Sequence, residues 1–343
     1  MTTQIVFIIS AFLLTYLGVR AFRRWTLRRE ILDVPNERSS HSVPTPRGGG
    51  LVIVLVCLVF YSIYAGLFAR NFSAGYFAGA VLIAVVSWFD DLKSVSSALR
   101  FLVHAIGAAL AISSLGFWRE IYLPFAGETN FGSLGIIITF FWIIWLTNAY
   151  NFMDGIDGIA GTQGLTAGIG WLLIGVFFNL EITGLLGGVL AFSNLGFLIH
   201  NWQPARIFMG DVGSAFQGYT FAVLPLLAAA EMRVGQPSRT MLAAAAVFLV
   251  WLFVFDTLYT FFRRLLRGEK FWLAHRSHLY QRLVISGYRH AFVTLLYGIL
   301  SVIIAAAVLF WLRAGNAPDA VLLFPVFASS LGIIIFSRAR RNV

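Results

Sequence analysis

Residues 131–178 read FGSLGIIITFFWIIWLTNAYNFMDGIDGIAGTQGLTAGIGWLLIGVFF. Two apolar runs, at about 131–148 and 160–178, flank a short segment that is rich in Asn, Asp and Gly. The hydrocarbon core of a bilayer is about 30 Å thick, and a helix needs about 20 apolar residues to cross it. The pattern therefore predicts two membrane-spanning helices joined by a polar loop.

The rest of the chain repeats this alternation of apolar runs and polar loops. Further apolar runs lie at about 4–22, 49–69, 74–89, 99–117, 183–200, 214–230, 239–262, 290–312 and 319–336. We expect an all-α polytopic membrane protein with about eleven transmembrane helices, which form a single integral membrane domain over residues 1–343.

The composition supports this class. Of the 343 residues, 59% are hydrophobic and 12% are charged, whereas soluble chains have about 45–50% apolar and about 25% charged residues. These values exclude a soluble domain and a disordered chain. The single cysteine, Cys57, lies in an apolar run, so no disulfide forms within the chain.

The positive charges predict the orientation. Five arginines directly follow the first apolar run, which predicts an N-terminus outside and, with an odd number of spans, a cytoplasmic C-terminus. The cytoplasmic loops are then about 20–48, 90–100, 149–159, 201–213 and 263–289. With the tail after residue 336, they hold 20 of the 25 Lys and Arg residues, so the net charge of +10 belongs to membrane topology and not to nucleic-acid binding.

Acidic residues gather on the same side. Charged groups at membrane depth are costly and usually functional. Six aspartates fall at or near the predicted cytoplasmic ends of helices: Asp90, Asp91, Asp154, Asp157, Asp211 and Asp256. The gathering predicts a functional site at the cytoplasmic face.

Two of these acidic clusters have simpler alternatives. Adjacent Asp90 and Asp91 repel each other, so a cation, a metal-bound phosphate or a shared proton must relieve them, unless they only form a solvated helix end. Asp211 precedes an apolar helix, so it either caps that helix or is a carboxylate beside a cavity.

The third acidic cluster lies between the two runs quoted above. Asn148, Asn151, Asp154 and Asp157 follow one another at intervals of three, which keeps helical side chains on one face. This arrangement favours a place in the functional site, and the alternative is an ordinary polar loop between two helices.

Two further segments, the first of them basic, complete the predicted face. In the loop 263–289, His275 and His278 bracket Arg276, which indicates side chains that donate hydrogen bonds to phosphate. The alternatives are half of a zinc site or a plain positive-inside loop. Arg263 and Arg264 are expected to be ordinary anchoring charges. The first loop, Asp33–Gly50, ends in glycines at a helix start, which either bind an anion or permit helix packing. Carboxylates together with Arg and His side chains that bind phosphate favour Mg²⁺-dependent phosphoryl transfer to a lipid.

In their order, these motifs resemble the polyprenyl-phosphate N-acetylhexosamine-1-phosphate transferases of bacterial membranes, the glycosyltransferase 4 family. The matching segments are Asp33–Gly50, Phe89–Asp91, Asn148–Gly161, Asn201–Gly218 and His275–Arg282, and NFMDGIDGIAG is the most specific of them. The resemblance implies an enzyme that joins a sugar phosphate from a UDP-sugar to polyprenyl phosphate and releases UMP. It also implies Mg²⁺, with Mn²⁺ as a possible substitute, and an active site on the cytoplasmic face of the bacterial inner membrane.

The resemblance also implies a role for each site residue. Asp90 and Asp91 would handle the lipid phosphate, one of them as its base, and Asp211, together with Asp154, would bind the metal. The remaining residues would bind the substrate. Asn151, Asp154, Asp157 and Asn201 would hold its nucleotide end, Phe208 would stack on uracil, and His275, Arg276 and His278 would reach the sugar or diphosphate. Arg47 and Asn148 would be further substrate-binding residues.

Details of two motifs favour one branch of the family. The sequence His-Arg-Ser-His replaces the adjacent histidines of the peptidoglycan branch, and Pro-Thr-Pro-Arg-Gly-Gly also points to enzymes that begin O-antigen or similar surface glycans. The expected donor is therefore a UDP-N-acetylhexosamine rather than the muramyl-pentapeptide. The alternative function is a transporter or lipid flippase, which would hold its charges near the middle of the bilayer between repeats.

Overall fold

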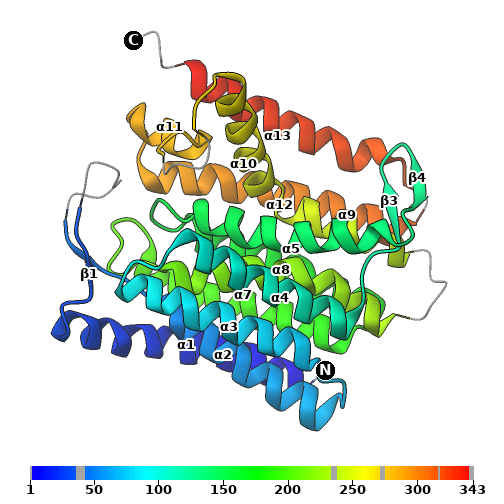
Figure 1. Ribbon diagram of the computed structural model, residues 1–343, viewed down its shortest axis with the longest axis horizontal. Coiled ribbons are helices and arrows are strands. Elements are labelled where there is room, and N and C mark those ends of the chain that lie inside the picture. The colour runs from blue at the N-terminus through cyan, green and yellow to red at the C-terminus, as the bar shows by residue number, and fades with distance from the viewer. Residues whose placement is uncertain (1, 36–42, 233–237, 271–274, 316, 340–343) are drawn as a thin grey trace.

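The computed structural model describes residues 2–35, 43–232, 238–270, 275–315 and 317–339. Most of them form helices that run side by side in one bundle (Figure 1). The helices that cross the bundle are α1 (Thr2–Arg28), α2 (Gly50–Ile63) with its π-helical extension η1 (Tyr64–Phe68), α3 (Ala74–Leu92), α4 (Ser97–Leu115), α5 (Leu134–Phe152), α6 (Ile159–Phe178), α7 (Glu181–Asn201), α8 (Asp211–Glu231), α12 (His290–Ala314) and α13 (Asp319–Ala339).

The predicted fold class is confirmed. Within the described ranges, ten helices are long and apolar enough to cross a membrane. The helices α9 (Ser238–Leu249) and α10 (Trp251–Leu266) meet at Val250 with a bend of 68°, and the number of spans is eleven if this bent pair counts as one. In Figure 1, α1 begins and α13 ends at opposite ends of the bundle, as an odd number of spans requires.

The connections contain short elements that the sequence did not predict. Strands β1 (Leu32–Asp33) and β2 (Thr45–Pro46) pair antiparallel, and so do β3 (Glu120–Leu123) and β4 (Gly127–Asn130). Helix α11 (Leu279–Ile285) lies in the basic loop.

Helix α8 occupies the centre of the bundle. All of its residues from Val212 to Ala228 are buried, and it contacts α2, α3, α5 and α7. Its first residue is Asp211, so this carboxylate lies at one end of the bundle, on the central helix.

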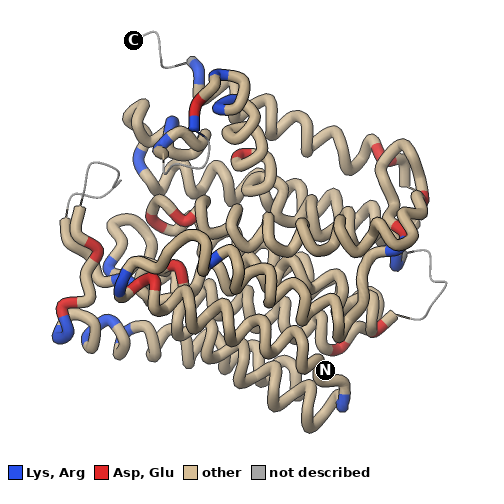
Figure 2. Tube along the Cα trace, in the orientation of Figure 1, with Lys and Arg blue, Asp and Glu red and all other residues tan. Residues whose placement is uncertain are grey.

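Charged residues are concentrated at that same end. Figure 2 shows most Lys and Arg residues and several acidic residues at the end of the bundle where α1 and α13 end. The opposite end carries fewer basic residues, in line with the predicted loop charges, while the side on which each terminus lies stays a prediction.

Candidate functional site

Asp91 holds α3 against the start of α8. Its Oδ1 accepts a hydrogen bond from the backbone N–H of Asp211 at 3.0 Å, and its Oδ2 accepts one from Val212 at 3.1 Å. The side chain is buried, with an exposed fraction of 3%. Gly210 has φ +79°, and a Cβ there would collide with this carboxylate. Asp91 therefore caps the N-terminus of α8, where a carboxylate also meets the favourable end of the helix dipole.

Asp90 faces a different group. Its Oδ2 accepts a hydrogen bond from Nη1 of Arg100 at 2.7 Å, and the same Nη1 lies 3.3 Å from Oδ2 of Asp211. Oδ1 of Asp90 accepts the N–H of Val95 at 2.6 Å. A single cationic group thus bridges one carboxylate from α3 and one from α8, and both pairs are partly exposed.

The loop after α5 adds amide and acidic side chains. Nδ2 of Asn151 donates to Oγ of Ser214 at 3.1 Å, next to Asp211, whereas Asn148 donates to the carbonyl of Ile144 within its own helix. Asp154 is partly exposed, but the surrounding protein and the nearby charges of Asp91 and Asp157 raise the pKa of its carboxyl to about 7. Asp154 therefore changes its charge near neutral pH.

Asp157 and Asn201 are used to build the loop. Oδ2 of Asp157 accepts the N–H of Ala205 at 3.1 Å, and its Oδ1 lies 3.4 Å from Nδ1 of His290. Oδ1 of Asn201 accepts the N–H of Gly158 at 2.9 Å, and its Nδ2 donates to the carbonyl of Ile207. These bonds fix the 154–158 loop against the 202–207 loop, so any contact of Asp157 or Asn201 with a ligand stays a prediction.

The first loop pairs with the segment before α8. The N–H of Phe208 donates to the carbonyl of Pro46 at 2.8 Å, and the carbonyl of Phe208 accepts the N–H of Gly49 at 2.9 Å. Arg47 directly follows Pro46 in this segment. Residues 36–42 of the predicted loop lie outside the described residues.

The basic loop forms a second wall of the site. His275 and His278 have ring centroids 5.0 Å apart, and Nδ1 of His275 lies 2.9 Å from Oγ of Ser277. Burial and the neighbouring positive groups lower the pKa of the His275 imidazole to about 4, so this ring is neutral at pH 7. The hydroxyl of Tyr280 donates to the carbonyl of Phe152 at 3.0 Å, which brings the loop against the segment that carries Asp154.

Arg263 and Arg264 do not fit the expectation of simple anchoring charges. Nη2 of Arg263 donates to the carbonyl of Ser277 at 2.6 Å, and Nη1 of Arg264 lies 3.5 Å from Oγ of the same residue. Arg264 is 8% exposed. Both arginines brace the loop that carries the two histidines, a contact between α10 and a distant segment that a charge count cannot detect.

Two further residues with a place in the site had no individual role assigned to them from the sequence. Arg100 joins the two carboxylates, and the signal available for it was a lone basic residue in the apolar run that follows Asp90 and Asp91. Asp256 was recognised as a cytoplasmic-end acid, but its contacts with residues 278–280 depend on a long loop closing back onto α10.

The donor set suits a hard divalent cation better than zinc. In the described part of the chain, no three His, Cys, Asp or Glu side chains are grouped as a metal cage. Asp90 and Asp211 nevertheless share one positive group through carboxylate oxygens. Mg²⁺ is usually held by one or two carboxylates plus substrate phosphates. The two carboxylates fit that arrangement.

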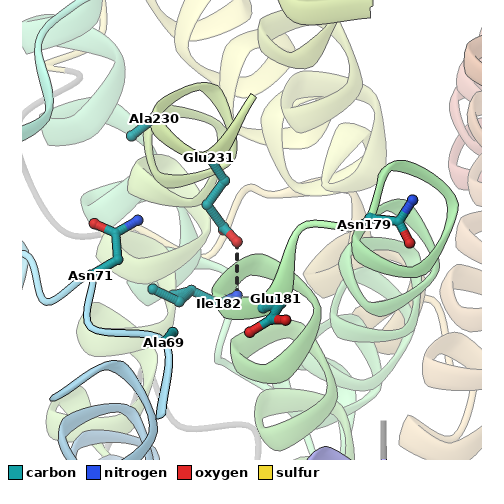
Figure 3. Close-up of a pocket in the computed structure, with 7 residues that line it drawn as sticks. All are labelled: Ala69, Asn71, Asn179, Glu181, Ile182, Ala230 and Glu231. Atoms are coloured by element: carbon teal, nitrogen blue, oxygen red, sulfur yellow. Dashed lines mark hydrogen bonds between the residues drawn. The ribbon is translucent and has the colours of Figure 1, made fainter. Parts of the chain in front are cut away.

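A separate cavity of about 260 Å³ lies at the other end of the bundle (Figure 3). It is lined in part by Glu181 and Glu231, and Glu231 ends the helix that Asp211 begins. Glu231 accepts the N–H groups of Ile182 and Thr183, at 2.9 and 2.8 Å, and therefore caps α7. This acidic cavity is remote from the carboxylates of the candidate site.

Comparisons with known proteins agree on one kind of enzyme. The family model described as Glycosyl transferase family 4 matches residues 73–229. The chain is 31% identical to "Probable undecaprenyl-phosphate N-acetylglucosaminyl 1-phosphate transferase" of Bacillus subtilis (strain 168), over 83% of this chain and 78% of the relative. It is 29% identical to "Decaprenyl-phosphate N-acetylglucosaminephosphotransferase" of Mycobacterium leprae (strain TN), over 84% and 78%.

A less similar relative is named for a different sugar phosphate. The identity to "Phospho-N-acetylmuramoyl-pentapeptide-transferase" of Streptococcus pneumoniae serotype 2 is 26%, over 64% of this chain and 71% of the relative. All three relatives are named as transferases of a phosphorylated sugar.

Proposed function

Because this chain belongs to glycosyl transferase family 4, we propose that it transfers N-acetylhexosamine-1-phosphate from a UDP-sugar to polyprenyl phosphate. An oxygen of the lipid phosphate forms a bond to the sugar-bearing phosphorus, the bond from that phosphorus to the UMP portion breaks, and UMP leaves. The observation that carries the proposal is the convergence of Asp90, Asp211 and Arg100, from three different helices, at one end of the bundle.

The carboxylates divide the work in this proposal. Asp90 and Asp211, with Asp154 as the third candidate, would hold Mg²⁺, which when bound neutralises the charge of the transferring phosphates. Asp91 would act by capping α8, since both of its oxygens accept backbone N–H groups. Asp90 is therefore the better candidate than Asp91 for the group that faces the lipid phosphate.

The other wall would bind the donor. Arg276 offers a planar guanidinium suited to phosphate oxygens, and His275 and His278 flank it in the loop. Asn151, next to Asp211, is our candidate for the nucleotide end, with Phe208 against uracil.

We also propose that the donor is UDP-N-acetylglucosamine or a close relative, and that the product begins an O-antigen or related surface glycan. The higher identity to the two relatives named for N-acetylglucosamine, together with the His-Arg-Ser-His sequence, supports this choice over the muramyl-pentapeptide. The proposed site faces the cytoplasm at the inner membrane, because the loops around it carry most of the positive charge.

The test is release of UMP by the purified protein in detergent or nanodiscs. Undecaprenyl phosphate is offered with UDP-N-acetylglucosamine, UDP-N-acetylgalactosamine or UDP-N-acetylmuramyl-pentapeptide, with and without Mg²⁺. We expect Mg²⁺-dependent UMP release with one of the first two donors and none without the lipid. A protein that releases no UMP from any donor would favour the transporter or flippase.

A further inference from the structure

One face of α10 is built to hold the basic loop. Asp256, Thr260 and Arg264 follow one another at intervals of four, so they lie along one side of the helix. Asp256 is fully buried, with an exposed fraction of 0%, and Arg264 at the other end of the row contacts Ser277.

The Asp256 carboxylate binds more donors than a helix cap needs. Its Oδ1 accepts from the N–H of Leu279 at 2.8 Å, and its Oδ2 accepts from the N–H of Tyr280 at 3.0 Å, which caps α11. In addition, Nδ1 of His278 lies 3.1 Å from Oδ1, and the hydroxyl of Tyr297 donates to Oδ2 at 2.9 Å. The hydroxyl of Thr260 also donates to Oδ1, at 3.2 Å.

Such an arrangement is costly without a reason. Taking a carboxylate out of water is strongly unfavourable unless hydrogen bonds and charge compensate for it. A neutral side chain would cap a seven-residue helix such as α11 at lower cost. The imidazole contact is the feature that capping leaves unexplained, and it involves one of the three side chains proposed to reach the diphosphate.

We propose that Asp256 is a positioning residue that fixes the ring orientation and tautomer of His278. A carboxylate only accepts hydrogen bonds, so the proton of the neutral ring stays on Nδ1 and Nε2 is the nitrogen left for the substrate. The role in catalysis rests on the proposed function. Arg263 and Arg264, on the same helix as Asp256, further fix the loop by contacting Ser277.

The kinetic test compares Asp256→Asn with Tyr297→Phe, which removes a donor from the same carboxylate without touching the histidine. An amide presents an N–H as well as an oxygen, so it no longer enforces one tautomer. For Asp256→Asn we expect kcat per folded protein to fall about 10–100-fold, with KM within about threefold. Tyr297→Phe should stay within about threefold for both constants.

A double-mutant cycle separates positioning from general damage. In a His278→Gln background, Asp256→Asn should lower kcat by less than about threefold, because the group through which it acts is gone. An equal loss of kcat in both backgrounds would mean that Asp256 serves the fold alone and would overturn the proposal.

A measurement on the substrate-free wild-type protein tests the tautomer directly. In ¹⁵N NMR spectra of histidine-labelled protein at pH 8, the His278 signals are identified by their loss in His278→Gln. We expect a protonated Nδ1 and a bare Nε2, and the reverse tautomer would overturn the proposal. This readout requires neither turnover nor a folded Asp256 variant, so a wild-type protein that releases no UMP counts against the proposed function alone.

Discussion

Asp90 and Asp91 are neighbours in the chain, yet their replacement by Asn should have opposite consequences. In Asp91→Asn the amide oxygen still accepts one of the two N–H groups at the start of α8, and the amide nitrogen faces the other. One charge-assisted hydrogen bond in a buried place is lost, which costs about 1.5–3 kcal/mol. We therefore expect a protein whose melting temperature falls by a few degrees.

Asp90→Asn should instead spare the fold and remove the activity. The amide oxygen still accepts the Val95 N–H, and the lost ion pair with Arg100 is partly exposed, so the free energy of unfolding should change by less than about 1 kcal/mol. Loss of a charge that faces the transferring phosphates should lower kcat by about 10²–10³-fold.

The assay measures the melting temperature by tryptophan fluorescence and UMP release per folded protein for the wild type and both variants. The assignment of Asp91 as the cap of α8 fails if the melting temperature of Asp91→Asn equals that of the wild type. It fails equally if Asp90→Asn is the less stable of the two.

Further predictions concern the metal, the loop and pH. Asp211→Asn should insert and fold but lose turnover, and near-normal activity at saturating Mg²⁺ would exclude it as a ligand. Arg100→Gln should bind Mn²⁺ more tightly by electron paramagnetic resonance, because the competing guanidinium is gone, and unchanged or weaker binding would contradict its bridging position. Arg276→Lys should lower kcat more than it raises KM, and Arg267→Lys, at an exposed position, is the control; equal behaviour of the two would reduce the loop to an anchor. The Asp154 carboxyl has a pKa of about 7 in the folded protein against an ordinary value of 3.8. The folded state therefore binds more protons, and the stability contributed by this group declines as pH rises from about 4 to about 7. Asp154→Asn should match the wild-type melting temperature at pH 4 and exceed it at pH 8, and an equal difference at both pH values would refute the shift.

The sequence predicts the spans well because length and apolar character decide them. Runs such as 160–178 and 183–200 became α6 and α7 almost unchanged. The bend at Val250 and the two-residue strands β1 and β2 carry no comparable signal, since their geometry depends on what packs against them.

The site shows the same division between local and tertiary information. Helical geometry alone requires Asp90 and Asp91 to point in different directions, because adjacent helical residues differ by about 100°. Which of them meets α8 depends on how α3 packs, and only the three-dimensional contacts with Val212 and Arg100 decide it. The bracing of Ser277 by Arg263 is likewise a contact between segments that no spacing rule connects.

The connection between α6 and α7 has an effect at the far end of both helices. Only Asn179 and Leu180 separate them, Asn179 turns the chain with φ +56°, and Gly175 packs so closely on Gly184 that a Cβ would collide with it. The two helices are therefore held rigidly relative to each other at this connection. One residue inserted in the first turn of α7 would turn the rest of that helix by about 100° and shift it by about 1.5 Å. Helix α7 ends at Asn201, whose hydrogen bond to the N–H of Gly158 joins this helix to the loop that carries Asp154. The alignment of that loop is therefore set by a connection on the opposite side of the membrane.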